Sequence, residues 1–98
     1  MTSKQRAYLR GLANGIETIY QIGKGGITDN VVAQTEDALE ARELIKLRVL
    51  ETCEYTPREA LSVLAEACKA EPVQAIGSRI VLYRRAKKNP QITLPREK

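Results

Sequence analysis

The stretch TIYQIGKGGIT, from Thr18 to Thr28, decides how this chain folds. Its first five residues are β-type, the four residues Gly23-Lys24-Gly25-Gly26 form a flexible loop, and Thr28 is placed to open a helix. Glycines let a chain turn tightly and leave its backbone N–H groups accessible, while a helix start adds unpaired donors and a partial positive charge. Together with the Lys24 ammonium, these features predict a seat for a phosphate group.

Spacing separates the alternatives for this loop. A Walker A loop has Lys-Ser or Lys-Thr after its last glycine, but Ile27-Thr28 follows Gly26, so a nucleoside triphosphatase is disfavoured. A dinucleotide fingerprint fails because glycine stands at only two of its three positions, and 98 residues leave little room for a doubly wound sheet. The remaining spacing, GxxG, is that of the phosphate clamp in KH-type RNA-binding modules. A glycine-rich strand-to-helix turn that binds nothing is the alternative, and the four residues alone leave both interpretations open.

Length and composition predict one small domain, residues 1 to 86, followed by a basic C-terminal tail, residues 87 to 98. The sequence lacks Phe and Trp, so its core must consist of Leu, Ile, Val and Ala. No apolar run is long enough to span a membrane and no signal-peptide block begins the chain, so we expect a cytoplasmic protein. With two cysteines, Cys53 and Cys68, and no histidine, we expect neither a zinc site nor a disulfide framework, and no cofactor.

Charge is unevenly distributed along the chain. Residues 1 to 28 carry a net charge of +3, residues 29 to 71 carry −5 and residues 72 to 98 carry +6, within a total of +4. A basic chain with its acidic residues confined to the centre is expected to present one cationic and one anionic surface, as a polyanion binder does. The alternative is an even spread of charge that serves only solubility.

Hydrophobic periodicity and capping signals predict the element order α-β-α-β-α-β-β. The expected elements are a helix capped by Ser3 that ends near Asn14-Gly15, a strand at 18–22, a helix opened by Thr28, a strand at 45–50, a helix opened by the capping box Thr56-Pro57-Arg58-Glu59, and a hairpin of strands 73–76 and 79–84 around Gly77-Ser78. From Arg85 onward we expect a mobile basic tail with a short apolar segment, Ile92-Thr93-Leu94.

The strand at 45–50 indicates the architecture. Apolar residues alternate with Lys46 and Arg48, so one face of the sheet is core and the other is partly open and cationic. This pattern predicts a two-layer α/β sandwich with a four-stranded mixed sheet.

Each expected helix has an inward face. In the first helix the inward residues are expected to be Tyr8, Leu9, Leu12 and Ala13, with Gln5 at the edge, which leaves Arg6 and Arg10 as a solvent-facing pair. In the second helix the inward residues are expected to be Val31, Val32, Thr35, Ala38 and Leu39, with an acidic side outward. In the third helix the expected stripe is Ala60, Leu61, Leu64, Ala65 and Cys68.

Several segments, taken in order, match a known family. They are Thr2 to Arg10, Gln21 to Thr28, Arg42 to Lys46, Val73 to Gly77 and Val81 to Arg84. In these segments the chain resembles the CRM domain, named for chloroplast RNA splicing and ribosome maturation, and its bacterial stand-alone YhbY-like members. The resemblance implies a KH-like fold similar to the C-terminal domain of translation initiation factor three, with the GxxG loop and nearby basic residues on RNA. It also implies an association with precursors of the large ribosomal subunit.

The predicted function is therefore that of a non-enzymatic, monomeric RNA-binding protein that assists large-subunit assembly by contacting structured ribosomal RNA. The predicted RNA-binding residues are Gly23, Lys24, Gly25, Gly26, Thr28, Arg6, Arg10, Lys46, Arg48 and Arg84. No small-molecule substrate is expected. The alternative function is a protein-interaction adaptor whose acidic helix faces, including Glu36, Glu40 and Glu66, dock a basic ribosomal protein.

Overall fold

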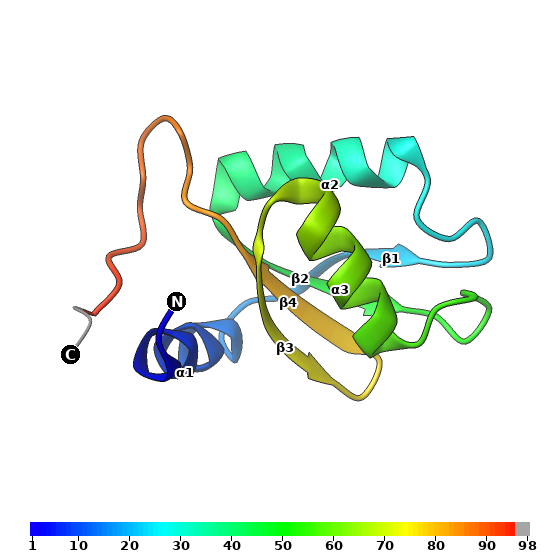
Figure 1. The fold of residues 1–98 in the computed structure, drawn as a ribbon, viewed down its shortest axis with the longest axis horizontal. Helices are drawn as coiled ribbons and strands as arrows, with labels where there is room; N and C mark the ends of the chain where they lie inside the picture. The colour runs from blue at the N-terminus through cyan, green and yellow to red at the C-terminus, as the bar shows by residue number, and fades with distance from the viewer. Residues whose placement is uncertain (96–98) are drawn as a thin grey trace.

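The computed structural model describes residues 1 to 95 and has three helices and four strands in the predicted order. The elements are α1 (Ser3–Ala13), β1 (Thr18–Ile22), α2 (Asp29–Arg42), β2 (Leu44–Val49), α3 (Pro57–Cys68), β3 (Glu71–Ile76) and β4 (Arg79–Tyr83) (Figure 1). The strands form one mixed sheet in the order β1-β2-β4-β3, in which β1 and β2 are parallel and the other pairs are antiparallel. The predicted α/β fold with a four-stranded mixed sheet is confirmed.

Side-chain caps set the helix starts. The predicted caps of α2 and α3 are confirmed: Thr28 accepts a hydrogen bond from the backbone N–H of Val31, and Thr56 forms a capping box with Glu59. The prediction for α1 was one residue off, because Thr2 rather than Ser3 is its N-cap. Thr2 has Gln5 three residues on to complete a capping box, whereas Ser3 would be followed at that spacing by Arg6, which has no acceptor.

The main core lies between the sheet and the helices α2 and α3. The predicted stripe of α3 is confirmed, since Ala60, Leu61, Leu64, Ala65 and Cys68 are all buried there. They pack with the inward residues of the strands, Ile22, Ile45, Leu47, Val49, Ile80 and Leu82. In this layer a hydrogen bond between the hydroxyls of Tyr20 and buried Thr35 links β1 to α2.

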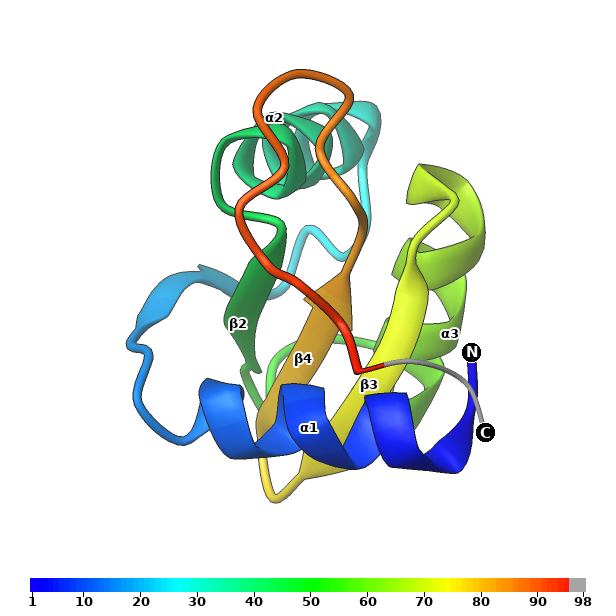
Figure 2. The same ribbon diagram turned by 90° about the vertical axis from the view of Figure 1, so that its left-hand side faces the viewer.

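The opposite face of the sheet is covered by α1 at one end only (Figure 2). Leu9 and Ala13 pack there in a second cluster with Leu44, Val73, Val81 and Tyr83. The predicted inward face of α1 was partly wrong: Tyr8 and Leu12 are 42% and 38% exposed, and Gln5 is buried in their place. A helix lying on one patch of sheet buries a stripe spaced by four residues, and Gln5, Leu9 and Ala13 form that stripe.

The hairpin of β3 and β4 is confirmed, with Gly77 in the left-handed region at φ +56°. The strand predicted at 73–76 begins two residues earlier, so Glu71 and Pro72 also belong to β3. Proline is tolerated there because β3 is an edge strand with one side unpaired.

The segment after β4 is held against the domain, so the prediction of a mobile tail from Arg85 onward was wrong for the residues that are described. Glu43 is 1% exposed and its carboxylate accepts hydrogen bonds from the backbone N–H groups of Ala86, Gln91 and Ile92 at 2.6 to 2.8 Å. Further along, Ile92 and Leu94 pack on the second cluster. Residues 96 to 98, also assigned to the tail, lie outside the described residues.

Glu43 also occupies a strained backbone position between α2 and β2. Its φ of +66° is unusual for a residue with a side chain, and such strain persists only where surrounding contacts enforce it. Its N–H bonds Leu39 and its carbonyl accepts from Arg84, so backbone and side chain together join α2, β2 and the C-terminal segment. Burial raises the pKa of Glu43, but the hydrogen bonds from Ala86, Ile92 and Gln91 together outweigh it and hold the pKa below its ordinary value of 4.5.

We expect Glu43→Gln to lower the free energy of unfolding at pH 7 by about 1 to 3 kcal/mol, because an amide cannot accept all three N–H donors. A depressed folded-state pKa stabilises the fold above the unfolded pKa, and this contribution is lost as pH falls through the folded value. The wild type should therefore lose more stability on acidification below pH 4.5 than the variant does. Urea unfolding across this pH range measures both, and parallel pH profiles would contradict the expectation.

Candidate functional site

The glycine loop joins the end of β1 to the start of α2 as a tight, exposed turn. The N–H of Gly26 donates to the carbonyl of Gly23 at 2.9 Å, and Gly26 has φ +69°, in the left-handed region. Lys24 and Gly25 are exposed, and a Cβ added at Gly25 would meet nothing within 4 Å. The backbone of the loop is therefore open to a ligand at the position where Lys24 supplies a charge.

Thr28 closes the loop as the N-cap of α2, with its hydroxyl already bonded to Val31. Asp29 follows in the first turn of the helix and is exposed. An acidic residue at this position stabilises the helix end, so the positive charge at the site comes from the loop rather than from the helix terminus.

Two other connections, the one after β2 and the β3–β4 turn, lie at the same end of the sheet as the glycine loop (Figure 1). The N–H of Leu50, just after β2, bonds the carbonyl of Ile22 at 2.9 Å, and a Cβ at Gly23 would lie 3.4 Å from the Leu50 side chain. The N–H of Val49 bonds the carbonyl of Ser78, in the β3–β4 turn, at 2.7 Å. Parallel pairing of β1 with β2 therefore places the loop beside the last residues of β2.

Of the two strand cations predicted for the site, Arg48 lies near this end and is exposed, while Lys46 lies two residues back and is half-buried. Both point to the face opposite the main core, because Leu47 and Val49 alternate with them and are buried in that core. Sequence reasoning missed Arg79, which is exposed and pairs directly with Arg48 across β2 and β4. The position of Arg79 just after the Gly77-Ser78 turn was visible in the sequence, but its partner depends on the strand order.

Arg6 and Arg10 do not lie beside the loop. They belong to α1, which covers the opposite end of the sheet (Figures 1 and 2). The guanidinium of Arg6 lies 3.6 Å from the carboxylate of Glu71, at the start of β3. Arg6 and Arg10 therefore lie at the opposite end of the sheet from Lys24.

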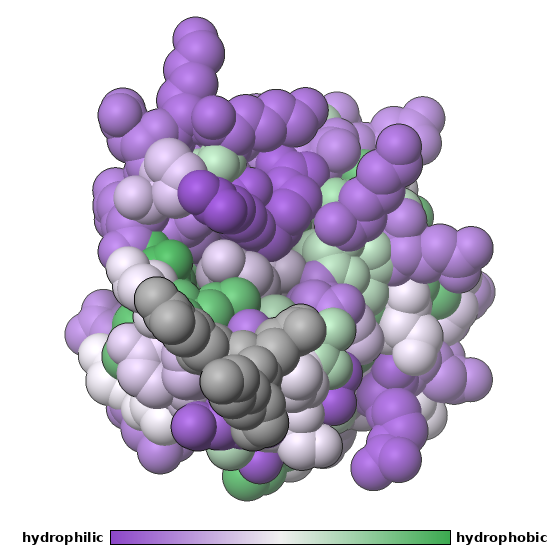
Figure 3. Space-filling view, turned by 60° about the vertical axis from the view of Figure 1, so that its left-hand side comes forward, coloured by the Kyte–Doolittle hydropathy of each residue, from purple (hydrophilic) through white to green (hydrophobic). Residues whose placement is uncertain are grey.

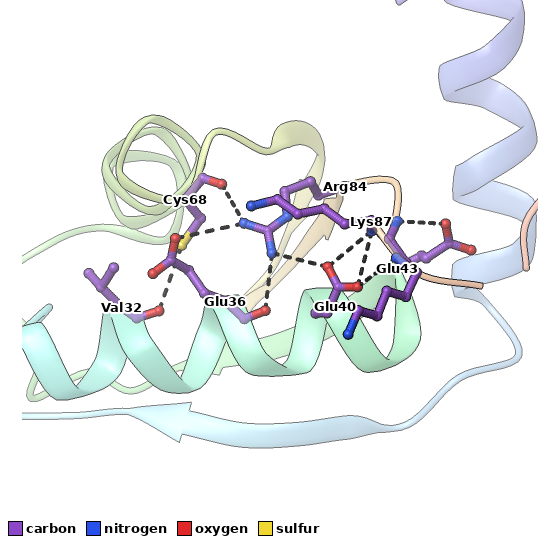
Figure 4. Close-up of polar contacts among 9 residues, drawn as sticks. Val32, Glu36, Glu40, Glu43, Cys68, Arg84 and Lys87 are labelled. Atoms are coloured by element: carbon purple, nitrogen blue, oxygen red, sulfur yellow. Dashed lines mark hydrogen bonds and ion pairs between the residues drawn. The ribbon is translucent and has the colours of Figure 1, made fainter. Parts of the chain in front are cut away.

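Arg84 is also placed elsewhere, on the acidic side of the fold (Figure 4). Its guanidinium donates to the carbonyls of Cys68 at 3.0 Å and Glu36 at 3.2 Å, and it pairs with the carboxylates of Glu36 and Glu40 at 3.7 and 4.0 Å. It therefore ties the end of α3 to α2. The prediction that Arg84 contributes cationic surface was wrong, because its side chain is largely buried and both terminal nitrogens of its guanidinium donate within the protein.

Two of the four acidic residues of α2, Glu36 and Glu40, are likewise used in contacts within the protein. Besides Arg84, the Glu40 carboxylate accepts hydrogen bonds from the backbone N–H groups of Lys87 and Lys88 at 3.0 to 3.1 Å, which lower its pKa. On the face seen in Figure 3, hydrophilic residues cover the upper part of the molecule, where Figure 1 places α2 and the turn after β4.

Chemically reactive groups are sparse in the described chain. Cys53 and Cys68 are free and buried, and burial raises the pKa of the Cys68 thiol, which makes it a poor nucleophile. Within residues 1 to 95, no cluster of three or more metal-ligating side chains is present. None of the helices described is both long and apolar enough to cross a membrane.

Fold and site together define a small α/β domain in which a strand, a GxxG loop and a helix present an exposed lysine at the end of a mixed sheet. A model of the CRS1/YhbY (CRM) domain matches residues 1 to 84, so the chain belongs to this family.

Named relatives are similar over nearly their whole length. The chain is 45% identical over 95 residues to "Probable RNA-binding protein YqeI" of Bacillus subtilis, covering 97% of this chain and 99% of that protein. It is 35% identical over 97 residues to an "RNA-binding protein" of Haemophilus influenzae, covering 99% and 97%. The solution structure of SAV1595 from Staphylococcus aureus, described as a hypothetical protein and a candidate RNA binder, matches with a TM-score of 0.81 and 50% identity, covering 97% and 99%.

The glycines of the loop differ in what they tolerate. Gly26→Ala should lower the free energy of unfolding by about 1 kcal/mol, because φ +69° is costly for a residue with a Cβ. Gly25→Ala is the matched control, since its φ is not in the left-handed region and the added methyl group meets open space. Chemical denaturation compares the two, and equal stability would contradict the geometry of the turn.

Replacing Arg84 separates its structural role from RNA contact. Arg84→Met keeps the stem of the side chain but removes both carbonyl contacts, so we expect a loss of about 1 to 3 kcal/mol in the free energy of unfolding. RNA affinity of the folded variant should stay at the wild-type value. A fall in RNA affinity with an unchanged free energy of unfolding would indicate instead that Arg84 contacts the RNA.

Proposed function

We propose that this protein is a non-enzymatic RNA-binding protein whose glycine loop holds a phosphate of the RNA backbone. The observation that carries the proposal is the exposed loop itself, in which Lys24 and Gly25 are exposed at the end of the sheet and the Gly25 backbone is open to a ligand. Backbone donors and a lone cation suit a phosphate oxygen, and Arg48 adds charge nearby. The names of the relatives support RNA as the ligand.

The RNA we propose is structured large-subunit ribosomal RNA, bound by a monomer in the cytoplasm during assembly of the subunit. The choice of ribosomal RNA is supported by the resemblance to the stand-alone bacterial members of the family. Recognition by shape and backbone fits the composition, because the chain has four tyrosines and neither Phe nor Trp for base stacking. Of these tyrosines, Tyr83 is buried and the hydroxyl of Tyr20 is bonded inside the domain.

The adaptor alternative loses support in the structure. Two of the three carboxylates that it requires, those of Glu36 and Glu40, pair with Arg84, and Glu40 also binds the segment after β4. Docking a basic protein on these groups would have to compete with contacts inside the fold. The acidic surface is better explained by the structural role it performs.

Lys24→Asp should weaken binding to a fluorescein-labelled RNA hairpin by about tenfold or more, because one charge-assisted phosphate contact becomes a repulsion. The slope of log affinity against log salt should become shallower by about one. Lys4→Asp is the control: Lys4 is exposed on α1, at the other end of the molecule, and the change in net charge is the same. Fluorescence anisotropy over a salt series measures both variants.

An equal loss of RNA affinity in Lys24→Asp and Lys4→Asp would contradict a phosphate-binding site at the loop and indicate non-specific electrostatic attraction. The finer proposal has its own test, co-sedimentation of the protein with ribosomal particles from cells. Wild-type protein should travel with precursors of the large subunit, and Lys24→Asp should remain at the top of the gradient. Wild-type protein that never enters these fractions would remove the ribosomal assignment but leave RNA binding intact.

A further inference from the structure

A row of exposed side chains, polar except at β3, crosses the open face of the sheet next to the glycine loop. Gln21 in β1 pairs with Arg48 in β2, Arg48 pairs with Arg79 in β4, and Arg79 pairs with Ile76 in β3. All four are exposed. The row therefore spans the whole width of the sheet at the end that α1 leaves uncovered.

The two arginines form a like-charge pair directly opposite each other. Residues in this relation on an antiparallel pair have Cβ atoms about 5 Å apart, and like charges there destabilise a sheet. Neither guanidinium makes an ion pair with any residue of the described chain, although Arg6 and Arg84 each find a carboxylate. A fold that leaves two adjacent arginines unneutralised is expected to meet an external anion there.

The surface around the pair has room for such an anion. Arg48 and Arg79 line an open recess of about 590 Å³, together with Thr18, Ile19, Tyr20 and Gln21 of β1. Arginine presents its N–H donors in a fixed fork that matches two oxygens of a phosphate group, and Gln21 adds a donor from the neighbouring strand. No acidic side chain lines the recess.

The recess also adjoins the loop. Gln21 is followed by Ile22, the last residue of β1, and then directly by Gly23. Lys24 is therefore three residues from Gln21, a separation of at most about 10 Å along an extended chain. Cations at these two points are close enough to contact one continuous polyanion.

We infer that Arg48 and Arg79, with Gln21, form a second phosphate-binding site on the open face of the sheet, which takes the backbone of the same RNA strand that enters the glycine loop. The inference rests on the proposed function for its ligand but not for its geometry. It extends the interface from a single loop to a strip that runs from Lys24 across three strands. It also gives Arg79, which no motif had indicated, a direct role in binding.

The test uses the full-length protein and the same fluorescein-labelled RNA hairpin. Arg48→Gln/Arg79→Gln should bind at least about tenfold more weakly, with a salt slope shallower by about two. Arg42→Gln/Arg58→Gln is the matched control, because it removes two exposed arginines from the helices α2 and α3 and should bind like the wild type. Arg48→Lys/Arg79→Lys should keep the salt slope but lose affinity, since lysine lacks the fork.

Thermal melting of the same variants distinguishes a binding role from a structural one. Removing mutual repulsion should leave the melting temperature of Arg48→Gln/Arg79→Gln equal to or above that of the wild type. Unchanged affinity and slope in this folded variant would overturn the second site, and a lower melting temperature with unchanged affinity would assign the pair to the fold instead.

Comparison with Lys24→Asp separates the two proposals. If Lys24→Asp weakens binding and the double glutamine variant does not, the second site fails while the loop stands. If only the double variant weakens binding, the loop fails and the sheet face alone carries the RNA.

Discussion

The parallel pairing of β1 with β2 is the constraint on which the rest of the structure depends. Parallel neighbours cannot be joined by a tight turn, so the chain must leave β1 at one end of the sheet and return through a crossover, here α2. The connection between β1 and α2 is therefore forced to the carboxyl edge of the sheet, where ligands of open α/β sheets commonly bind. In this chain that connection is the glycine loop, and the pairing of Ile22 with Val49 sets it beside the end of β2.

The other end of the sheet carries the stabilising polar contacts. Glu43 binds the segment after β4, Arg84 joins α2 to α3, and Arg6 meets Glu71. Part of the acidic charge of the central segment, on Glu36, Glu40, Glu43 and Glu71, is thus used in contacts within the protein.

Local signals were sufficient where the structure depends on near neighbours. The capping box of Thr56 and Glu59, the apolar stripe of α3 and the Gly77 turn each involve residues a few positions apart, and all three were predicted. Contacts between distant segments were not accessible in this way. The anchoring of residues 86 to 92 by Glu43 spans more than forty positions, and nothing about a glutamate ahead of a strand indicates it. The same holds for the candidate site. The glycine loop was predicted from the spacing of its own residues, whereas the internal contacts of Arg84 depend on the packing of α3 against α2.

Each end of the sheet contains one unfavourable local feature, but only one of the two features is compensated within the fold. Glu43 adopts a strained backbone angle, but three N–H donors and a buried position compensate within the fold. The facing arginines 48 and 79 have no such compensation among the described residues, and the sheet there lacks the cover that α1 provides at its other end. A strained backbone angle that is compensated inside the fold needs no partner. An uncompensated pair of like charges is stabilised by any anion that binds the folded state, by an amount that grows with the anion's concentration relative to its dissociation constant. An anion bound to Arg48 and Arg79 would therefore stabilise the uncovered end of the sheet.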